Sequence, residues 1–288
     1  MNRLAFKEYE NPDELKKLQS LTTDILGEFD RVCRKLDIPY FIYAGTAIGA
    51  VRHGGFIPWD DDIDVGMFRD DYDRFVREVP SVVGPDFEVI DYHDEPFFPA
   101  CNANLALRGT LCVPEEFDDC SFQYPIGIGI YAYDRISDDP KKRKQQLRGT
   151  WLWARLAFLR ATPCPHLFIE GWKKSVVSFL CRVAHALMRV LHVSPRWIHS
   201  KWEHYATLAR SEGDGLFVDF TDQNPLAWTA TKDEVFPLRD IAFDGLTVRM
   251  ANQYDAMLRR GYGDYMQLPP EDKRKNHYPS KLDFGRFA

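Results

Sequence analysis

Apolar residues recur at helical spacing near the start of the chain, at Leu15, Leu18, Ile25, Phe29, Val32 and Leu36. Asn11 and Pro12 precede them and are typical of a helix start, because asparagine can cap free N–H groups and proline fits the first helical position. Asp37 and Pro39 end the pattern. The sequence therefore predicts one long helix between Asn11 and Asp37.

Short apolar runs follow, and their length and bulky residues predict buried strands at 40–44, 62–68, 87–91, 102–107, 110–113 and 126–133. Gly45 and Thr46 predict a tight turn that leads into a short helix from Ala47 to Arg52. Asp70 is expected to cap a further helix, which ends at Pro80.

Residues 138–212 have a helical pattern almost throughout, and the tail mixes short strands (216–220 and 241–243) with a helix at about 253–260. This order lacks the regular alternation of a doubly wound sheet. We therefore expect an α/β protein of mixed α and β elements, with a mixed-sheet core at 1–137, an inserted helical block at 138–212 and a C-terminal part at 213–288 that packs on the core. The three segments are expected to form one continuous domain.

Two stretches of the helical block, Trp151–Arg160 and Val176–Arg189, are amphipathic and partly basic. Such helices can lie on a membrane surface. Surface helices of globular proteins show the same pattern, so we expect these two to pack on the main domain, with peripheral membrane contact as the alternative.

The charge balance is slightly acidic, with 37 Lys and Arg against 43 Asp and Glu and a net charge of −6. A nucleic-acid partner is not expected, because such proteins usually carry a basic excess. The six cysteines form no C-x-x-C pair and no Cys/His spacing of a zinc site, so we expect buried free thiols in a reducing compartment. They are Cys33, Cys101, Cys112, Cys120, Cys164 and Cys181. The first residues contain no apolar signal core, and no apolar run is long enough to span a bilayer. We expect a cytoplasmic protein.

The most informative stretch is an acidic run, Asp60, Asp61, Asp62 and Asp64. Side chains alternate along a strand, so Asp62 and Asp64 should share one face while Ile63 and Val65 enter the core. Two carboxylates so close repel each other unless a cation lies between them. Hard oxygen ligands suit magnesium or manganese bound to phosphate oxygens. The alternative is a solvated surface run, but the large apolar neighbours speak against it.

The segment before this run is suited to phosphate. Gly45 and Thr46 follow a predicted strand and open a helix, where free N–H groups and the helix dipole favour an anion. Arg52 is a candidate phosphate contact because guanidinium matches phosphate geometry; a surface ion pair with the acidic run is the alternative. His53 is a candidate general base, although a histidine beside two glycines is more commonly structural.

The stretch GTAIGAVRHGGFIPWDDDIDV, from Gly45 to Val65, resembles the signature of the LicD family, whose members transfer phosphocholine from CDP-choline to cell-surface glycans. The likeness continues in DDYDRF at 70–75, in Tyr133-Asp134-Arg135, in Glu234-Val235-Phe236 and in GYGDYMQLPPEDKR at 261–274. It spans roughly 15–277, with a weaker match in the helical middle.

This resemblance implies a nucleotidyltransferase fold in which Gly45 and Thr46 bind the donor phosphate and Asp62 and Asp64 hold magnesium or manganese. The donor would be a CDP-alcohol such as CDP-choline. A sugar hydroxyl of a glycan or lipid-linked glycan precursor, at the inner face of the membrane, would attack the phosphorus, with CMP leaving. A quaternary ammonium group would bind aromatic faces, for which Trp59, Tyr43 and Tyr131 are candidates.

One position departs from the family pattern. A third aspartate, which helps to hold a metal and to deprotonate the attacking hydroxyl, is replaced by Gly129, and a nearby family lysine is replaced by Leu105 or Ala106. Asp134, five residues on, should point to the opposite face of the strand. Gly129 therefore favours a second hypothesis, a catalytically weakened homologue that binds a nucleotide, a glycan or a partner enzyme. A third is nucleotidyl transfer onto a small molecule.

Overall fold

The computed structural model describes residues 9, 11–163, 171–271, 274 and 276–288. Its helices are α1 (Pro12–Leu36), α2 (Ala44–His53), α3 (Arg69–Glu78), α4 (Pro140–Ala161), α5 (Trp172–Val190), α6 (Pro195–Ala206), α7 (Lys232–Val235) and α8 (Tyr254–Tyr262). Its strands are β1 (Phe41–Ile42), β2 (Asp64–Phe68), β3 (Phe87–Ile90), β4 (Ala103–Leu107), β5 (Leu111–Pro114), β6 (Gly127–Arg135), β7 (Phe217–Asp219), β8 (Thr229–Ala230), β9 (Arg239–Phe243), β10 (Leu246–Met250) and β11 (Pro279–Asp283).

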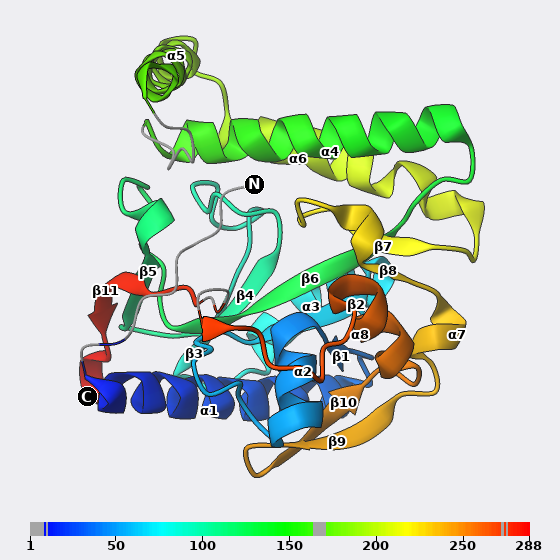
Figure 1. The fold of residues 1–288 in the computed structure, drawn as a ribbon. Helices are drawn as coiled ribbons and strands as arrows, with labels where there is room; N and C mark the ends of the chain where they lie inside the picture. Colours follow the sequence, from blue (N-terminus) through cyan, green and yellow to red (C-terminus); the bar gives the residue numbers. More distant parts are fainter. Residues whose placement is uncertain (1–8, 10, 164–170, 272–273, 275) are drawn as a thin grey trace.

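A nine-stranded mixed sheet forms the centre of the molecule, with seven strands in the order β3-β4-β6-β2-β1-β10-β9; β7 pairs with β6, and β8 with β7. The β2–β6 and β1–β10 pairs are parallel and the remaining pairs are antiparallel. Figure 1 shows the helices placed between and around these strands. The expected α/β class with a mixed sheet is confirmed.

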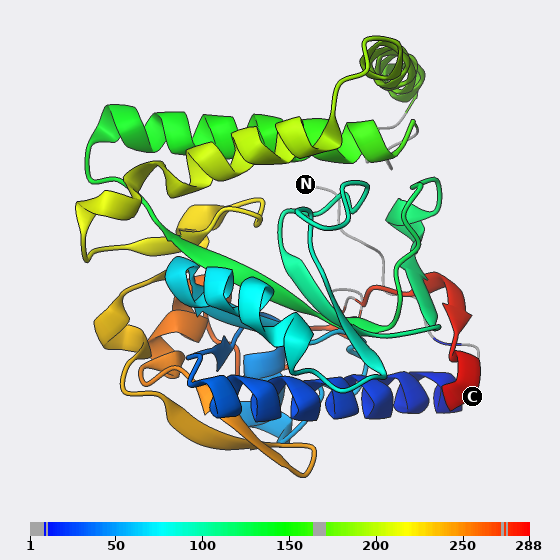
Figure 2. The ribbon, with the colours of Figure 1, turned by 180° about the vertical axis from the view of Figure 1, so that it is seen from behind.

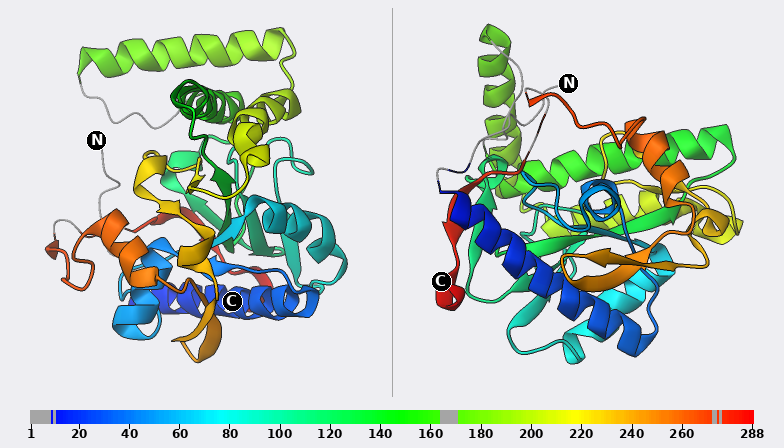
Figure 3. Two further views of the ribbon diagram at one scale, coloured as in Figure 1. Left: turned by 90° about the vertical axis from the view of Figure 1, so that its right-hand side faces the viewer. Right: turned by 60° about the horizontal axis from the view of Figure 1, so that its bottom comes forward.

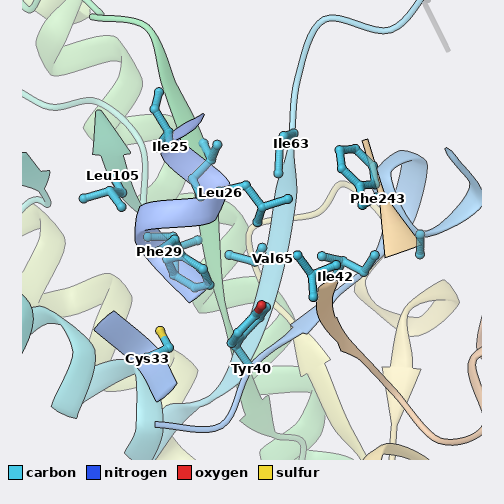
Figure 4. Packing of buried hydrophobic residues seen from close by; sticks show 14 of the residues in the cluster. Ile25, Leu26, Phe29, Cys33, Tyr40, Ile42, Ile63, Val65, Leu105 and Phe243 are labelled. Carbon is cyan, nitrogen blue, oxygen red and sulfur yellow. The ribbon is translucent and has the colours of Figure 1, made fainter. Parts of the chain in front are cut away.

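One face of the sheet carries the main hydrophobic core, which α1 and α3 cover (Figure 2). Figure 4 shows side chains of α1, among them Leu26 and Phe29, directed towards Ile42 and Val65 of the sheet. α1 begins and ends as predicted: the Asn11 side chain accepts a hydrogen bond from the Asp13 N–H, and Asp37 ends the helix in a left-handed conformation. This face fixes the orientation of β2, and so turns Asp64 to the other side.

Most predicted strands are found with shifted ends. The run at 40–44 is a strand only at β1, because α2 begins at Ala44 and already includes Gly45 and Thr46. β2 begins at Asp64, not at residue 62. α3 begins at Arg69, so Asp70 lies in its first turn instead of capping it. Strands β8, β10 and β11 were not predicted.

The helical block at 138–212 contains α4, α5 and α6, which Figure 3 shows on one side of the sheet. α4 and α6 pack on β7 and the end of β6 through a cluster that includes Trp202, Ile136 and Val218. The expected packing on the main domain is therefore found for α4, whereas α5 buries only His185.

Cys33, Cys101 and Cys120 are buried as expected, Cys112 and Cys181 are partly exposed, and Cys164 lies outside the described residues. Among the described helices, none alone is long and apolar enough to cross a bilayer. The pair formed by α5 and Pro195–Glu212 is long and apolar enough when taken together, but it is bent by 109°.

Candidate active site

Asp62 and Asp64 lie together at the start of β2 and line a cavity of about 450 Å³. Their apolar neighbours Ile63 and Val65 are fully buried in the core, as the alternation predicted. The core therefore holds this segment, and the two carboxylates are directed to the cavity side.

The carboxylate of Asp64 belongs to a row of residues that crosses three strands. Asp64 is paired with Gly129 of the parallel strand β6, and Gly129 is paired with Asn104 of β4. Paired residues of neighbouring strands share a face. Gly129 thus lies beside Asp64, at the position where the resemblance to the LicD family implies a third carboxylate.

The Tyr131 side chain fills the space beside Gly129. A Cβ atom at position 129 would lie 2.6 Å from Cε2 and 2.8 Å from the hydroxyl oxygen of Tyr131, and 3.0 Å from Oδ1 of Asp64. Tyr131 stands two residues along β6, on the same face, and its hydroxyl group hydrogen bonds with Asp64. The ring packs edge-on against Tyr43, with 5.6 Å between ring centroids. Glycine at 129 therefore accommodates this tyrosine.

Asp219 is the acidic residue that the fold brings towards Asp64 on this face. It ends β7, where it is paired with Tyr133 of β6, and its charge acts on Asp64. Its Oδ1 accepts hydrogen bonds from the Thr221 N–H and hydroxyl at 2.7 and 2.6 Å, and its Oδ2 accepts one from the Tyr43 hydroxyl at 3.2 Å. Burial raises the pKa of Asp219 to about 6. Thr221 lines the cavity, so Asp219 is held directly behind its wall.

His277 provides a positive charge beside Asp62. Its Nδ1 lies 3.0 Å from Oδ2 of Asp62, and its backbone N–H donates to Asp61 at 2.7 Å. The Tyr9 hydroxyl donates to the other oxygen of Asp61 at 2.9 Å. In the described part of the chain, the atoms of Asp61, Asp62 and His277 that could bind a metal ion lie within 4.8 Å of one another. Asp61 therefore anchors the segment near His277 against the acidic run.

The charges at the site are unevenly balanced. Burial opposes ionisation of Asp62, but the charge of His277 and its hydrogen bond outweigh this and lower the pKa of Asp62. Burial raises the pKa of Asp64 well above its usual value, and Asp62 raises it further. In return, Asp62 raises the pKa of His277. A divalent cation bound by carboxylate oxygens would offset this burial and repulsion and favour the ionised form of Asp64.

The start of α2 holds the acidic run in place. The Asp64 N–H donates to the buried Thr46 hydroxyl at 2.8 Å. A Cβ atom at Gly45 would lie 2.9 Å from Oδ2 of Asp60, so the absence of a side chain allows this carboxylate to approach the helix N-terminus. Burial raises the pKa of Asp60 well above its usual value, with Asp62 adding to the effect. Gly45 and Thr46 therefore contact the aspartate segment directly.

Arg52 and His53 lie at the other end of α2. The Arg52 guanidinium donates to the Tyr265 carbonyl at 2.8 Å and to His53 at 2.9 Å. Neither residue lines the cavity with Asp62 and Asp64. These contacts fasten α2 to the tail of the chain, and the phosphate contact of Arg52 stays a prediction.

Aromatic side chains form much of the remaining cavity wall: Phe98, Phe117, Tyr124, Tyr131 and Phe158. Of the three predicted aromatics, only Tyr131 is in this wall. Tyr43 is buried behind it, and the Trp59 ring lies under the Arg274 guanidinium at 4.4 Å. Leu105 and Ala106, the two alternatives for the position of the family lysine, are both fully buried. The cavity thus combines carboxylates at one end with aromatic surface elsewhere.

Two other buried acids near the sheet, Asp134 and Asp91, lie away from this cavity. Asp134 is on the opposite face of β6, as predicted, where it forms a buried bidentate ion pair with Arg69 at 2.8 and 2.7 Å. Asp91 follows β3 and accepts hydrogen bonds from the backbone of His93 and Asp94. Neither lines the cavity.

Asp219 and His277 were missed by sequence reasoning. A signal existed for Asp219: it stands within a short apolar strand, Phe217 to Phe220, where an ionisable residue is rare unless it has partners. No local signal existed for His277, since its contacts with Asp61 and Asp62 form only through the fold.

The fold and site define an α/β protein with a mixed sheet, whose central strands direct paired aspartates into an aromatic-walled cavity. Residues 37–98 match the family described as LicD/FKTN/FKRP, nucleotidyltransferase domain. This match confirms the resemblance seen in the sequence.

Individual relatives extend this match. Lipopolysaccharide cholinephosphotransferase LicD of Haemophilus influenzae is 27% identical over 281 residues, which is 92% of this chain and 96% of the relative. Ribitol 5-phosphate transferase FKRP of Homo sapiens is 44% identical over 57 residues, 20% of this chain and 11% of the relative. Ribitol-5-phosphate transferase FKTN of Macaca fascicularis is 29% identical over 72 residues, 24% of this chain and 16% of the relative.

Proposed function

We propose that the protein is a metal-dependent phosphotransferase that moves a phosphorylated alcohol, phosphocholine or a related group, from a CDP-activated donor to a sugar hydroxyl of a cell-surface glycan precursor. The observation that carries the proposal is the placement of Asp62 and Asp64 side by side on one cavity. The likeness to a lipopolysaccharide cholinephosphotransferase over 92% of the chain supports the substrate class.

In this proposal, a sugar hydroxyl oxygen attacks the phosphorus that carries the alcohol. A new O–P bond forms, the bond to the bridging oxygen breaks, and CMP leaves with the electron pair. A magnesium or manganese ion held by Asp62 and Asp64 would neutralise charge on the phosphate oxygens. Gly45 and Thr46 hold the aspartate segment against α2, so they position these ligands.

We assign the missing third negative charge to Asp219. Asp219 is the acceptor of the hydroxyl proton in this proposal, because burial raises its affinity for a proton while Asp64 is engaged with the metal. A base with a pKa near the working pH is the most effective. Tyr43 and Thr221 hold Asp219 in this position through their hydrogen bonds.

The second candidate function is a weakened homologue that binds the donor or a glycan without turnover. It is favoured by Gly129 and by the Tyr131 ring, which occupies the place of the family's third carboxylate. The two candidates differ in the outcome of a single assay, since only the first releases CMP.

The test measures CMP release from CDP-choline and from CDP-ribitol, with a glycan acceptor and either magnesium or manganese. Wild-type protein should release CMP, and Asp64→Asn should reduce the rate by roughly 10²-fold or more. Asp219→Asn should reduce it as well, whereas Asp86→Asn, a surface acid paired with Arg286, should leave it unchanged. Manganese binding by calorimetry should be lost in Asp62→Asn and Asp64→Asn.

Manganese titration curves that coincide for wild type and both variants would refute the metal site. Binding of CDP-choline without CMP release would select the weakened homologue. Release of pyrophosphate from a nucleoside triphosphate, with no reaction of any CDP-alcohol, would replace both with nucleotidyl transfer.

A further inference from the structure

α5 lies at the outer edge of the molecule, across α4 and on the side away from the sheet (Figure 3). One buried residue, His185, anchors it: the His185 Nδ1 lies 2.8 Å from the Leu159 carbonyl oxygen of α4. The turn after α5 is held by Arg160, whose Nε donates to the Val193 carbonyl at 3.0 Å. The helix is thus attached along one side only.

The side of α5 that faces away from α4 is apolar. Its exposed large side chains are Trp172, Val176, Phe179, Leu180, Val183, Leu187 and Val190, with exposed fractions from 38% to 74%. At 3.6 residues per turn these positions fall within an arc of roughly 100°. The less exposed positions 177, 178, 181, 184, 185 and 188 fall on the opposite side. We call this set of seven residues the α5 stripe.

The segment from residue 140 to residue 202, which includes α5, is strongly positive. Residues 140–202 contain thirteen lysines and arginines and a single acidic residue, Glu170, within a chain whose overall net charge is −6. On α5 itself, Lys173, Lys174, Arg182 and Arg189 are exposed, and at helical spacing they lie outside the α5 stripe. Nearly all the acidic charge of the protein is therefore outside residues 140–202.

We propose that the α5 stripe docks on an anionic lipid bilayer, with α5 lying parallel to the membrane surface. An apolar helix face flanked by basic residues inserts among acyl chains while its charges meet the headgroups. Tryptophan, present at Trp172 and Trp151, favours the boundary between apolar and wet regions. A second copy of the chain fits less well, because docking two α5 stripes would bring like charges together.

The helix that carries α5 also borders the candidate active site. Ala154 and Phe158 of α4, the helix that carries α5, line the cavity together with Asp62 and Asp64. Docking of the α5 stripe would therefore hold the cavity-bearing part of the protein at the surface that carries lipid-linked molecules. This link to an acceptor rests on the proposed function, whereas the docking surface itself does not.

The test uses sedimentation of the full-length protein with vesicles in the absence of any donor or acceptor. Vesicles of phosphatidylcholine mixed with phosphatidylglycerol should bind the protein, and pure phosphatidylcholine vesicles should bind it much more weakly. Substituting serine at Phe179, Leu180 and Leu187 should lower binding by on the order of 10²-fold. A control triple variant, with serine at Leu216, Leu226 and Leu268, removes comparably exposed leucines elsewhere and should bind like wild type.

Charge is tested separately by Lys173→Gln and Arg189→Gln, each expected to lower binding to the mixed vesicles by roughly fivefold. Lys16→Gln on α1 is the matched control. Circular dichroism and thermal unfolding should show that all these exposed variants fold like wild type.

Equal binding of wild type and the stripe variant, or no binding to the mixed vesicles, would overturn the proposal. So would equal binding to both vesicle types without salt dependence. A concentration-dependent dimer that the stripe substitutions dissociate would assign the surface to a second copy. Because no step of the assay uses a donor, failure of the proposed phosphotransfer would leave a positive vesicle result intact.

Discussion

Replacing Gly129 by aspartate tests whether the missing third carboxylate can simply be restored. A Cβ atom there would lie 2.6 Å from Cε2 of Tyr131, whereas non-bonded carbons prefer about 3.5–4.0 Å. The Tyr131 ring would have to move by about 1 Å, although Tyr43 packs against it and Asp64 hydrogen bonds with its hydroxyl. The new carboxylate would also join Asp64 and Asp219, which already repel each other.

We therefore expect Gly129→Asp to lower the free energy of unfolding by about 1–3 kcal/mol, the usual cost of overpacking, and not to increase CMP release. Gly129→Ala adds the same Cβ atom without charge, and should carry most of the steric cost. In the double variant Gly129→Asp with Tyr131→Ala, space for the carboxylate exists, so manganese should stabilise it more than it stabilises either single variant.

Urea unfolding with and without manganese, combined with CMP release, measures these differences. A Gly129→Asp protein as stable as wild type, with faster CMP release, would refute the argument. It would mean that the Tyr131 ring moves aside without loss of stability and that position 129 can accept a carboxylate side chain. Equal destabilisation of the single and double aspartate variants would show that charge, and not the tyrosine ring, limits this position.

Three further predictions concern residues around the site. Asp134→Asn removes the bidentate counter-charge of the buried Arg69 guanidinium and leaves only Asp73, at 3.6 Å, so it should cost about 3–5 kcal/mol in urea unfolding; unchanged stability would contradict the ion pair, and manganese binding should persist. Hydrogen bonding to Asp91 raises the pKa of His93 to about 10 in the folded protein. The stability that protonated His93 contributes is therefore complete below its unfolded pKa of about 6.5 and is lost as the pH rises through its folded pKa. With the side chain 47% exposed, His93→Gln should cost at most about 1 kcal/mol near neutral pH and nothing in alkali; the reverse trend would argue against this pairing. Phe158→Ala should raise the KM for CDP-choline by roughly tenfold through loss of an aromatic face while leaving that for CDP-ribitol unchanged, and equal effects on both donors would indicate a purely structural role.

Sequence alone determined the local parts of this protein. The apolar period and the Asn11-Pro12 cap determined α1, and the alternation of Asp62, Ile63, Asp64 and Val65 determined which side chains enter the core. Both patterns repeat over a few residues, where the geometry of a helix or a strand relates neighbouring side chains directly. Shifted ends, as at β1 and α2, arose where glycine and alanine fit more than one conformation.

Only the tertiary structure decided how the site is completed. Asp219 reaches the aspartate face because β7 pairs with β6, and His277 meets Asp62 because the tail returns to the acidic run. Tyr131 fills the space at Gly129 through a contact that depends on the rotamer of its ring. Likewise, the sequence pattern of α5 fits a packed helix and an exposed one equally. Which face is covered depends on the neighbours that the fold supplies, and local periodicity does not encode them.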